Sequence, residues 1–248
     1  MAYRDPRRGN GSGPFGGPPR DPRHQSPFNA LPPVVVGLAL AIAAVEAMFQ
    51  AASAGLLGGA AGVGWRLEAI RDWGVAPVVW EWMLENRAFP PELLARFVTY
   101  PFLHSGFTHA AFVCVFVLAL GNVCAPAFPR WRPLVLFFVP AIAGALAYVI
   151  LYPGAAPLFG GYPGAYGLIG AFTLLVRRGL TRVPPDRAFL LIGLLLAIQP
   201  VFGLAAGAGF AWLPDWTAEL VGAAAGYGLA AFLLDGGPRG LRDRMRRR

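Results

Sequence analysis

Long apolar runs separated by short polar segments fill the chain from residue 31 onward. A transmembrane helix needs roughly 20 predominantly apolar residues, and most of these runs reach that length. The pattern therefore predicts an all-α membrane protein with six transmembrane helices and a long outward first loop. The expected spans lie within residues 31–62, 102–128, 134–152, 161–178, 188–208 and 216–234.

The segments outside these runs differ in composition. Residues 1–30 are rich in Pro, Gly and Arg and have no apolar run, so we expect a disordered cytoplasmic tail. Residues 31–235 form the expected membrane domain, and residues 236–248 form a basic cytoplasmic tail. Residues 63–99 carry mixed charge and four tryptophans, which favours a boundary loop with a short interfacial helix at residues 78–84.

Charge supports a membrane assignment and gives an orientation. Only 14% of residues are charged, and all 21 basic residues are arginine. Of these arginines, 17 fall in the two tails and in the loops after the second and fourth runs. Because positive loops stay inside, both termini are expected in the cytoplasm, with the protein in a bacterial inner membrane. The net charge of +8 is thus attributed to membrane topology, and no nucleic-acid partner is expected.

Two carboxyl groups fall inside apolar runs. Glu46 lies in the first run, with Gln50 one turn later, and Glu219 lies in the last. A carboxyl group within a membrane span either has a function or is neutralised by protonation or by a partner in the bundle. Both interpretations remain open for Glu46.

Glycines indicate where two helices meet. Residues 161–170 hold four glycines, among them Gly164, Gly167 and Gly170, and Gly222 and Gly226 form a G-x-x-x-G pattern in the last run. Small residues allow helix backbones to approach closely. The sequence therefore predicts a contact between the fourth and sixth helices at these positions.

Several short motifs together resemble the rhomboid family of intramembrane serine proteases. They are the segment 99–104 followed by His109, Gly121 at the end of the second run, Gly164-Ala165-Tyr166-Gly167, and Ala218-Glu219-Leu220-Val221-Gly222. The resemblance covers residues 96–234 and implies a six-helix bundle. It also implies a serine nucleophile on the fourth helix, a histidine base on the sixth, and a histidine and an asparagine on the second that hold the oxyanion.

The sequence departs from this pattern at the chemical positions. Tyr166 stands at the serine position, Glu219 at the base position and Val113 at the asparagine position, whereas His109 is retained. A phenol is a poor acyl-transfer nucleophile, and valine cannot donate to an oxyanion. Ala95 and Ala125 also replace residues typical of the family. No catalytic residue is therefore expected.

The sequence gives little support for another nucleophile or for a metal site. Ser105 lies near His104 and His109 but has no acid partner in sequence, and hydrogen-bonded structural histidines are the simpler interpretation. Too few His, Cys and carboxylate side chains converge for a metal site, and no cofactor is expected.

The resulting hypothesis is a catalytically inactive rhomboid-like membrane protein. Its partners would be the lipid bilayer and the transmembrane helices of client proteins or of a membrane complex. One alternative is an active intramembrane serine-type endopeptidase with an unrecognised nucleophile. Another is a small transporter, suggested by Glu46 and Glu219. We further expect the Tyr166 hydroxyl to donate to Glu219, or Glu219 to turn to His109, within hydrogen-bonding distance.

Overall fold

The computed structural model describes residues 31–128, 130–205, 207 and 209–234, and all of its helices and its single β-bridge lie there. The predicted tails, residues 1–30 and 236–248, lie outside the described residues. The regular elements are helical, which confirms the all-α class. In chain order they are α1 (Pro33–Ser53), α2 (Gly59–Gly62), α3 (Trp65–Trp73), α4 (Pro77–Glu85), α5 (Pro91–Thr99), η2 (Tyr100–Phe102), α6 (Phe107–Cys124), α7 (Arg132–Leu151), α8 (Tyr162–Arg177), η3 (Pro185–Arg187), α9 (Leu190–Ala205) and α10 (Leu213–Leu234).

Five described helical segments are long and apolar enough to cross a membrane, so the protein is a multi-pass integral membrane protein. They are α1, α6, α7, the segment Pro185–Ala205 that contains α9, and α10. The predicted fourth span corresponds to α8, which has 16 residues and is shorter than the roughly 20 that a full span needs. The count of six spans therefore stays a prediction.

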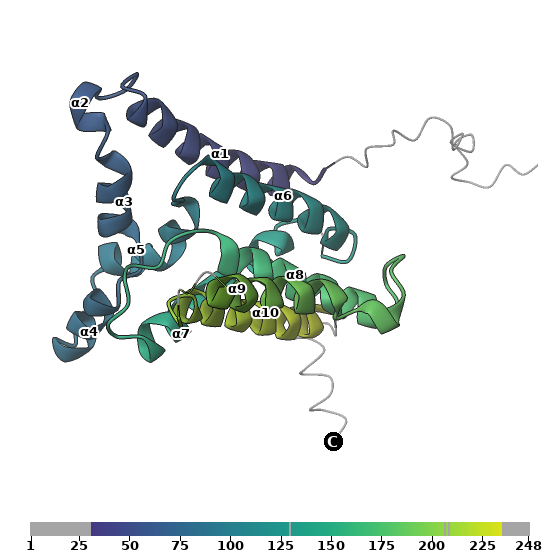
Figure 1. Cartoon of the computed structure of the whole chain (residues 1–248). Helices are drawn as coiled ribbons and strands as arrows, with labels where there is room; N and C mark the ends of the chain where they lie inside the picture. The colour runs from purple at the N-terminus through teal and green to yellow at the C-terminus, as the bar shows by residue number, and fades with distance from the viewer. Residues whose placement is uncertain (1–30, 129, 206, 208, 235–248) are drawn as a thin grey trace, which may run out of the picture. The chain divides into compact units, whose positions relative to one another are not determined.

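Helix α8 lies at the centre of the bundle. Of its 16 residues, 13 are buried, and it packs against α10, α7 and α6. Figure 1 shows α8 among α7, α9 and α10, with α1 lying beside α6. A short helix surrounded by protein needs no lipid-facing length, which explains how so short an element can sit inside the membrane part.

Glycines line the contact between α8 and α10. A Cβ atom added at Gly226 would overlap the backbone of Gly167, and one added at Gly170 would overlap the Ala223 carbonyl. At Gly222 the added atom would overlap the carbonyl of Pro163. Backbone therefore touches backbone at several points, and no larger side chain fits there.

The first loop folds into helices rather than staying irregular. The interfacial helix expected at residues 78–84 is present as α4, between α3 and α5. Several polar contacts tie this part of the chain to the bundle, and two of them lie near the segment before α8. Tyr100 donates its hydroxyl to the Ala141 carbonyl on α7 at 2.8 Å, and Val75 and Leu158 exchange two backbone hydrogen bonds of 3.0 and 2.9 Å. These ties hold the loop over the segment that leads into α8.

The first two predicted ranges each contain one long helix. The first span was expected within residues 31–62, and α1 lies there; it ends at Ser53, where Gly55 and Gly58 adopt left-handed conformations with φ of 75° and 68°. The second was expected from residue 102, but residues 100–102 form a separate 3-10 turn and α6 begins at Phe107. Apolar composition continues past these helix ends, so it overestimates the length of the spans.

Candidate functional site

The start of α8 forms one wall of a cavity. Pro163 stands in the first turn, where a missing N–H leaves no helix hydrogen bond broken. Gly160 precedes it with φ of 102°, and a Cβ atom there would lie 2.9 Å from the His109 ring. Only glycine combines this backbone conformation with so close an approach to the ring.

The cavity has a volume of about 670 Å³. Its walls come from the segment that leads into α6 and the start of α6, from α7, from the segment before α8 and the start of α8, and from α9 and α10. The polar side chains that line it are Ser105, His109, Tyr148, Tyr162, Gln199, Trp212, Asp215 and Glu219. Two of the sequence-predicted positions, His109 and Glu219, thus line one concave site.

Glu219 is almost fully buried, with 3% of its surface exposed. Its two carboxyl oxygens both accept a hydrogen bond from Nε2 of Gln199 on α9, at 2.7 Å each. The Tyr166 side chain lies near this carboxyl. Within the described residues, no hydrogen bond joins Glu219 to His109. The expected bond from Tyr166 to Glu219 stays a prediction, whereas Gln199, which the sequence analysis did not include, is the hydrogen-bond partner of Glu219.

Gln199 is the one polar side chain in α9. A lone amide in a membrane helix needs a hydrogen-bond partner, so its isolation in an apolar run indicates a polar contact with another helix. Its partner is 20 residues away on another helix, and the sequence pattern gives no means of pairing the two.

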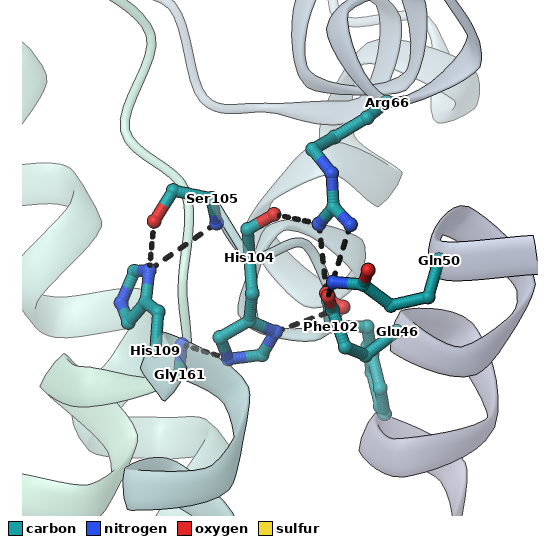
Figure 2. Close-up of polar contacts among 8 residues, drawn as sticks. All are labelled: Glu46, Gln50, Arg66, Phe102, His104, Ser105, His109 and Gly161. Atoms are coloured by element: carbon teal, nitrogen blue, oxygen red, sulfur yellow. Dashed lines mark hydrogen bonds and ion pairs between the residues drawn. The ribbon is translucent and has the colours of Figure 1, made fainter. Parts of the chain in front are cut away.

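His109 faces the cavity with one ring nitrogen occupied. Nδ1 accepts the backbone N–H of Ser105 at 3.3 Å and lies 3.0 Å from the Ser105 hydroxyl oxygen (Figure 2). The neutral ring therefore carries its proton on Nε2. The ring stacks on Tyr162, with centroids 5.0 Å apart and planes 19° apart. Val113 is fully buried and packs where an added Cβ at Gly161 would lie, so it stands behind the cavity wall and has no polar atom to offer.

His104 is fully buried, and both of its ring nitrogens are used. Nδ1 donates to the Phe102 carbonyl at 3.2 Å, and Nε2 accepts the Gly161 N–H at 3.4 Å (Figure 2). Burial lowers the pKa of His104 to about 4, and the nearby His109 ring adds to the effect. The ring is a neutral structural element that fixes the backbone just before α8.

Glu46 is paired on the far side of His104. Arg66 from α3 binds both of its oxygens, at 2.7 and 2.9 Å, and Gln50 donates to it at 2.7 Å. The same guanidinium donates to the His104 carbonyl (Figure 2). Of the two interpretations left open for Glu46, the structure supports a paired carboxyl. Arg66 was missed because the loop that carries it had no predictable fold.

No group of three or more His, Cys, Asp or Glu side chains within the described residues is arranged to hold a metal ion. The cavity chemistry available on the chain itself consists of two carboxyls, one amide, one imidazole, one serine hydroxyl and several aromatic rings.

The fold and cavity define a class of protein: a multi-pass helical membrane protein with a cavity beside a short, glycine-lined central helix. The family model of the Rhomboid domain matches residues 91–236, which is more than half of the chain. The chain therefore belongs to the rhomboid family. A search of curated proteins gives no match.

Proposed function

We propose that this rhomboid family member binds transmembrane segments of other proteins, or of a membrane complex, without cleaving them. The observation that carries the proposal is the contact of Gln199 with both oxygens of Glu219, at the position where the family has its base. A carboxyl tied in this way next to a tyrosine does not form a nucleophile–base pair. Free tyrosine titrates near ~10 and glutamic acid near ~4, so proton transfer between them is unfavourable by about six pKa units.

The oxyanion side supports the same conclusion. His109 lines the cavity and carries its proton on Nε2, but Val113, at the family's asparagine position, is fully buried and has no donor. Losing a single oxyanion donor lowers kcat by about 10²–10³. The cavity has a volume of about 670 Å³, which supports binding of a ligand even where these groups do not support cleavage.

Helix α9 gives a route to the cavity from the membrane. None of its residues, all of which the structure describes, is buried. Its polar ties to α10 are the Gln199–Glu219 contact and the bond from Trp216 Nε1 to the Leu196 carbonyl at 2.7 Å. A helix held by so few contacts separates from its neighbour at low cost in free energy.

A second candidate function rests on one observation. The Ser105 hydroxyl lies 3.0 Å from Nδ1 of His109 at the cavity wall, which is the distance of a nucleophile–base pair. Against it, the same Nδ1 also accepts the Ser105 backbone N–H, and no carboxylate orients the ring among the described residues. The alternative is an active hydrolase that uses Ser105.

Labelling with a fluorophosphonate probe separates these functions. We expect no label on the purified wild-type protein, and we expect label on the triple variant Val113→Asn, Tyr166→Ser, Glu219→His, which restores the family residues. Mass spectrometry would locate any adduct. Label on Ser105 of the wild type, lost in Ser105→Ala, would establish the alternative, and cleavage of a transmembrane peptide by the wild type would overturn the proposal.

The orientation of the chain belongs to the same proposal. We infer that both termini lie in the cytoplasm of a bacterial inner membrane, because 17 of the 21 arginines fall in the tails and loops assigned to that side. Reporter fusions at residues 1 and 248 test it. An external signal from either terminus would contradict the assignment.

A further inference from the structure

The charged side chains that line the cavity are all acidic. They are Asp215 and Glu219, both on α10, and none of the described lining residues is an arginine. The chain as a whole has the opposite balance, with 21 basic and 13 acidic residues. A negative cavity in a positive protein indicates a ligand of positive charge.

The two carboxyls stand one helical turn apart on the same face of α10. Gln199 donates a hydrogen bond to each carboxyl oxygen of Glu219. Asp215, in contrast, makes no hydrogen bond or ion pair within the described part of the chain. Two carboxylates at this spacing repel each other, and water screens the buried Glu219 side less than the exposed Asp215 side. A cation placed between them removes this repulsion, and the protein itself supplies none there.

Aromatic rings complete the site. The rings of Tyr148, Tyr162 and Trp212 line the same cavity. The Tyr148 hydroxyl is already bonded to the Ala156 carbonyl at 2.8 Å, and Trp212 Nε1 to the Gly209 carbonyl at 2.8 Å. Since their polar atoms are engaged elsewhere, these two side chains offer mainly aromatic surface, and ring faces attract ammonium and guanidinium groups.

The size of the cavity limits what enters it. A helix with its side chains is about 10–12 Å across, so 670 Å³ holds little more than about one helical turn. A whole transmembrane helix does not fit. A long side chain with its neighbouring backbone does, and it arrives from the membrane past α9, the helix without buried residues.

We propose that the cavity binds the lysine or arginine side chain of a transmembrane segment, with Asp215 and Glu219 as its anionic partners. The inference rests on the proposed client-binding function and names the chemistry of the client: a segment with a basic residue near the outer end of its apolar stretch. A basic residue within the apolar stretch costs free energy when it faces lipid. A client segment that carries one is therefore stabilised when it binds a site that pairs the charge.

Peptide binding in nanodiscs of phosphatidylcholine tests the inference. Two labelled single-span peptides would be compared by fluorescence anisotropy, identical except for lysine or leucine at one position near the outer end. We expect the lysine peptide to bind at least about tenfold more tightly than the leucine peptide. The double variant Asp215→Asn, Glu219→Gln should bind the two equally.

Glu92→Gln is the matched control, because Glu92 is an exposed carboxyl on α5 away from the cavity, and it should keep the tenfold preference. Asp215→Asn alone changes a carboxyl with no bonded partner, so it keeps the fold and should lose part of the preference even if the double variant is unstable.

The outcomes are distinct. Equal binding of the two peptides by the wild type would overturn this inference and leave client binding intact. Binding of neither peptide would overturn both. Loss of the lysine preference in nanodiscs that contain phosphatidylethanolamine would show that a lipid headgroup occupies the site, which contradicts a client side chain. Cleavage of a bound peptide would overturn only the absence of catalysis.

Discussion

Gln199 on α9 donates one amide nitrogen to both carboxyl oxygens of Glu219 on α10, at 2.7 Å to each. This contact joins the most loosely packed membrane helix to the glycine-lined pair at the centre of the bundle. It also engages the Glu219 side chain, which our proposal places at the position of the family's base. One hydrogen-bonded pair thus connects α9 to α10 and occupies both oxygens of Glu219.

The first prediction concerns the energy of this contact. Gln199→Leu should lower the free energy of unfolding by about 1–2 kcal/mol, because it removes an interhelical bond and leaves a buried carboxyl with one partner fewer. Thermal unfolding in detergent measures the change. A double-mutant cycle with Glu219→Leu isolates the pair, and strictly additive effects would show that the contact contributes nothing.

The second prediction concerns the contact of α8 with α10. Gly222→Leu should destabilise the protein by about 3 kcal/mol, since the new side chain overlaps the Pro163 carbonyl. Gly228→Leu on the same helix is the control, because an added Cβ there meets nothing within 4 Å. If the two variants melt at similar temperatures in detergent, the close backbone contact is wrong.

The third prediction concerns the buried ion pair of the first loop. Arg66→Met should cost about 3 kcal/mol, because Glu46 is left without its cation in a site where its side chain is only 4% exposed. Arg71→Met breaks the exposed pair with Asp72 and should change stability by less than about 1 kcal/mol. Adding Glu46→Gln to Arg66→Met should recover part of the loss. A stability loss for Arg66→Met no larger than that for Arg71→Met would contradict a structural role for the pair.

The fourth prediction is a pH dependence. Because the pKa of His104 falls from about 6.5 in the unfolded chain to about 4 in the fold, the unfolded state binds its proton first as the pH drops. The contribution of neutral His104 to the free energy of unfolding is fully present above pH ~6.5. It decreases by up to about 3 kcal/mol as the pH falls toward ~4. Melting curves between pH 7.5 and 4.5 would show the decline.

His104→Gln is the companion variant for this measurement. Glutamine keeps an acceptor for the Gly161 N–H but does not titrate, so its melting temperature should fall less over the same pH range. If the variant and the wild type fall in parallel, other groups cause the acid sensitivity.

Particular residues show what the sequence makes predictable. The α8–α10 contact can be predicted from glycines at i, i+3 and i, i+4 spacing, because glycines at this spacing lie on one face of each helix and let the backbones approach. The partner of Glu219 does not follow, because α9 is apolar all around apart from Gln199, and the sequence has no periodic pattern that shows which face of α9 meets α10. Arg66 reaches Glu46 only because the first loop folds into helices, and loop folding depends on contacts distant in sequence.

The Glu46–Arg66 pair also has a consequence for biosynthesis. Glu46 emerges from the ribosome 20 residues before Arg66, and Arg66 emerges 38 residues before His104, whose carbonyl completes the cluster. At about 5–20 residues per second, Glu46 is without its cation for about one to four seconds. During that interval its carboxyl has Gln50, one turn later on the same helix, as a hydrogen-bond partner. Once Arg66 is made, the buried carboxyl can be neutralised by an ion pair instead of by protonation.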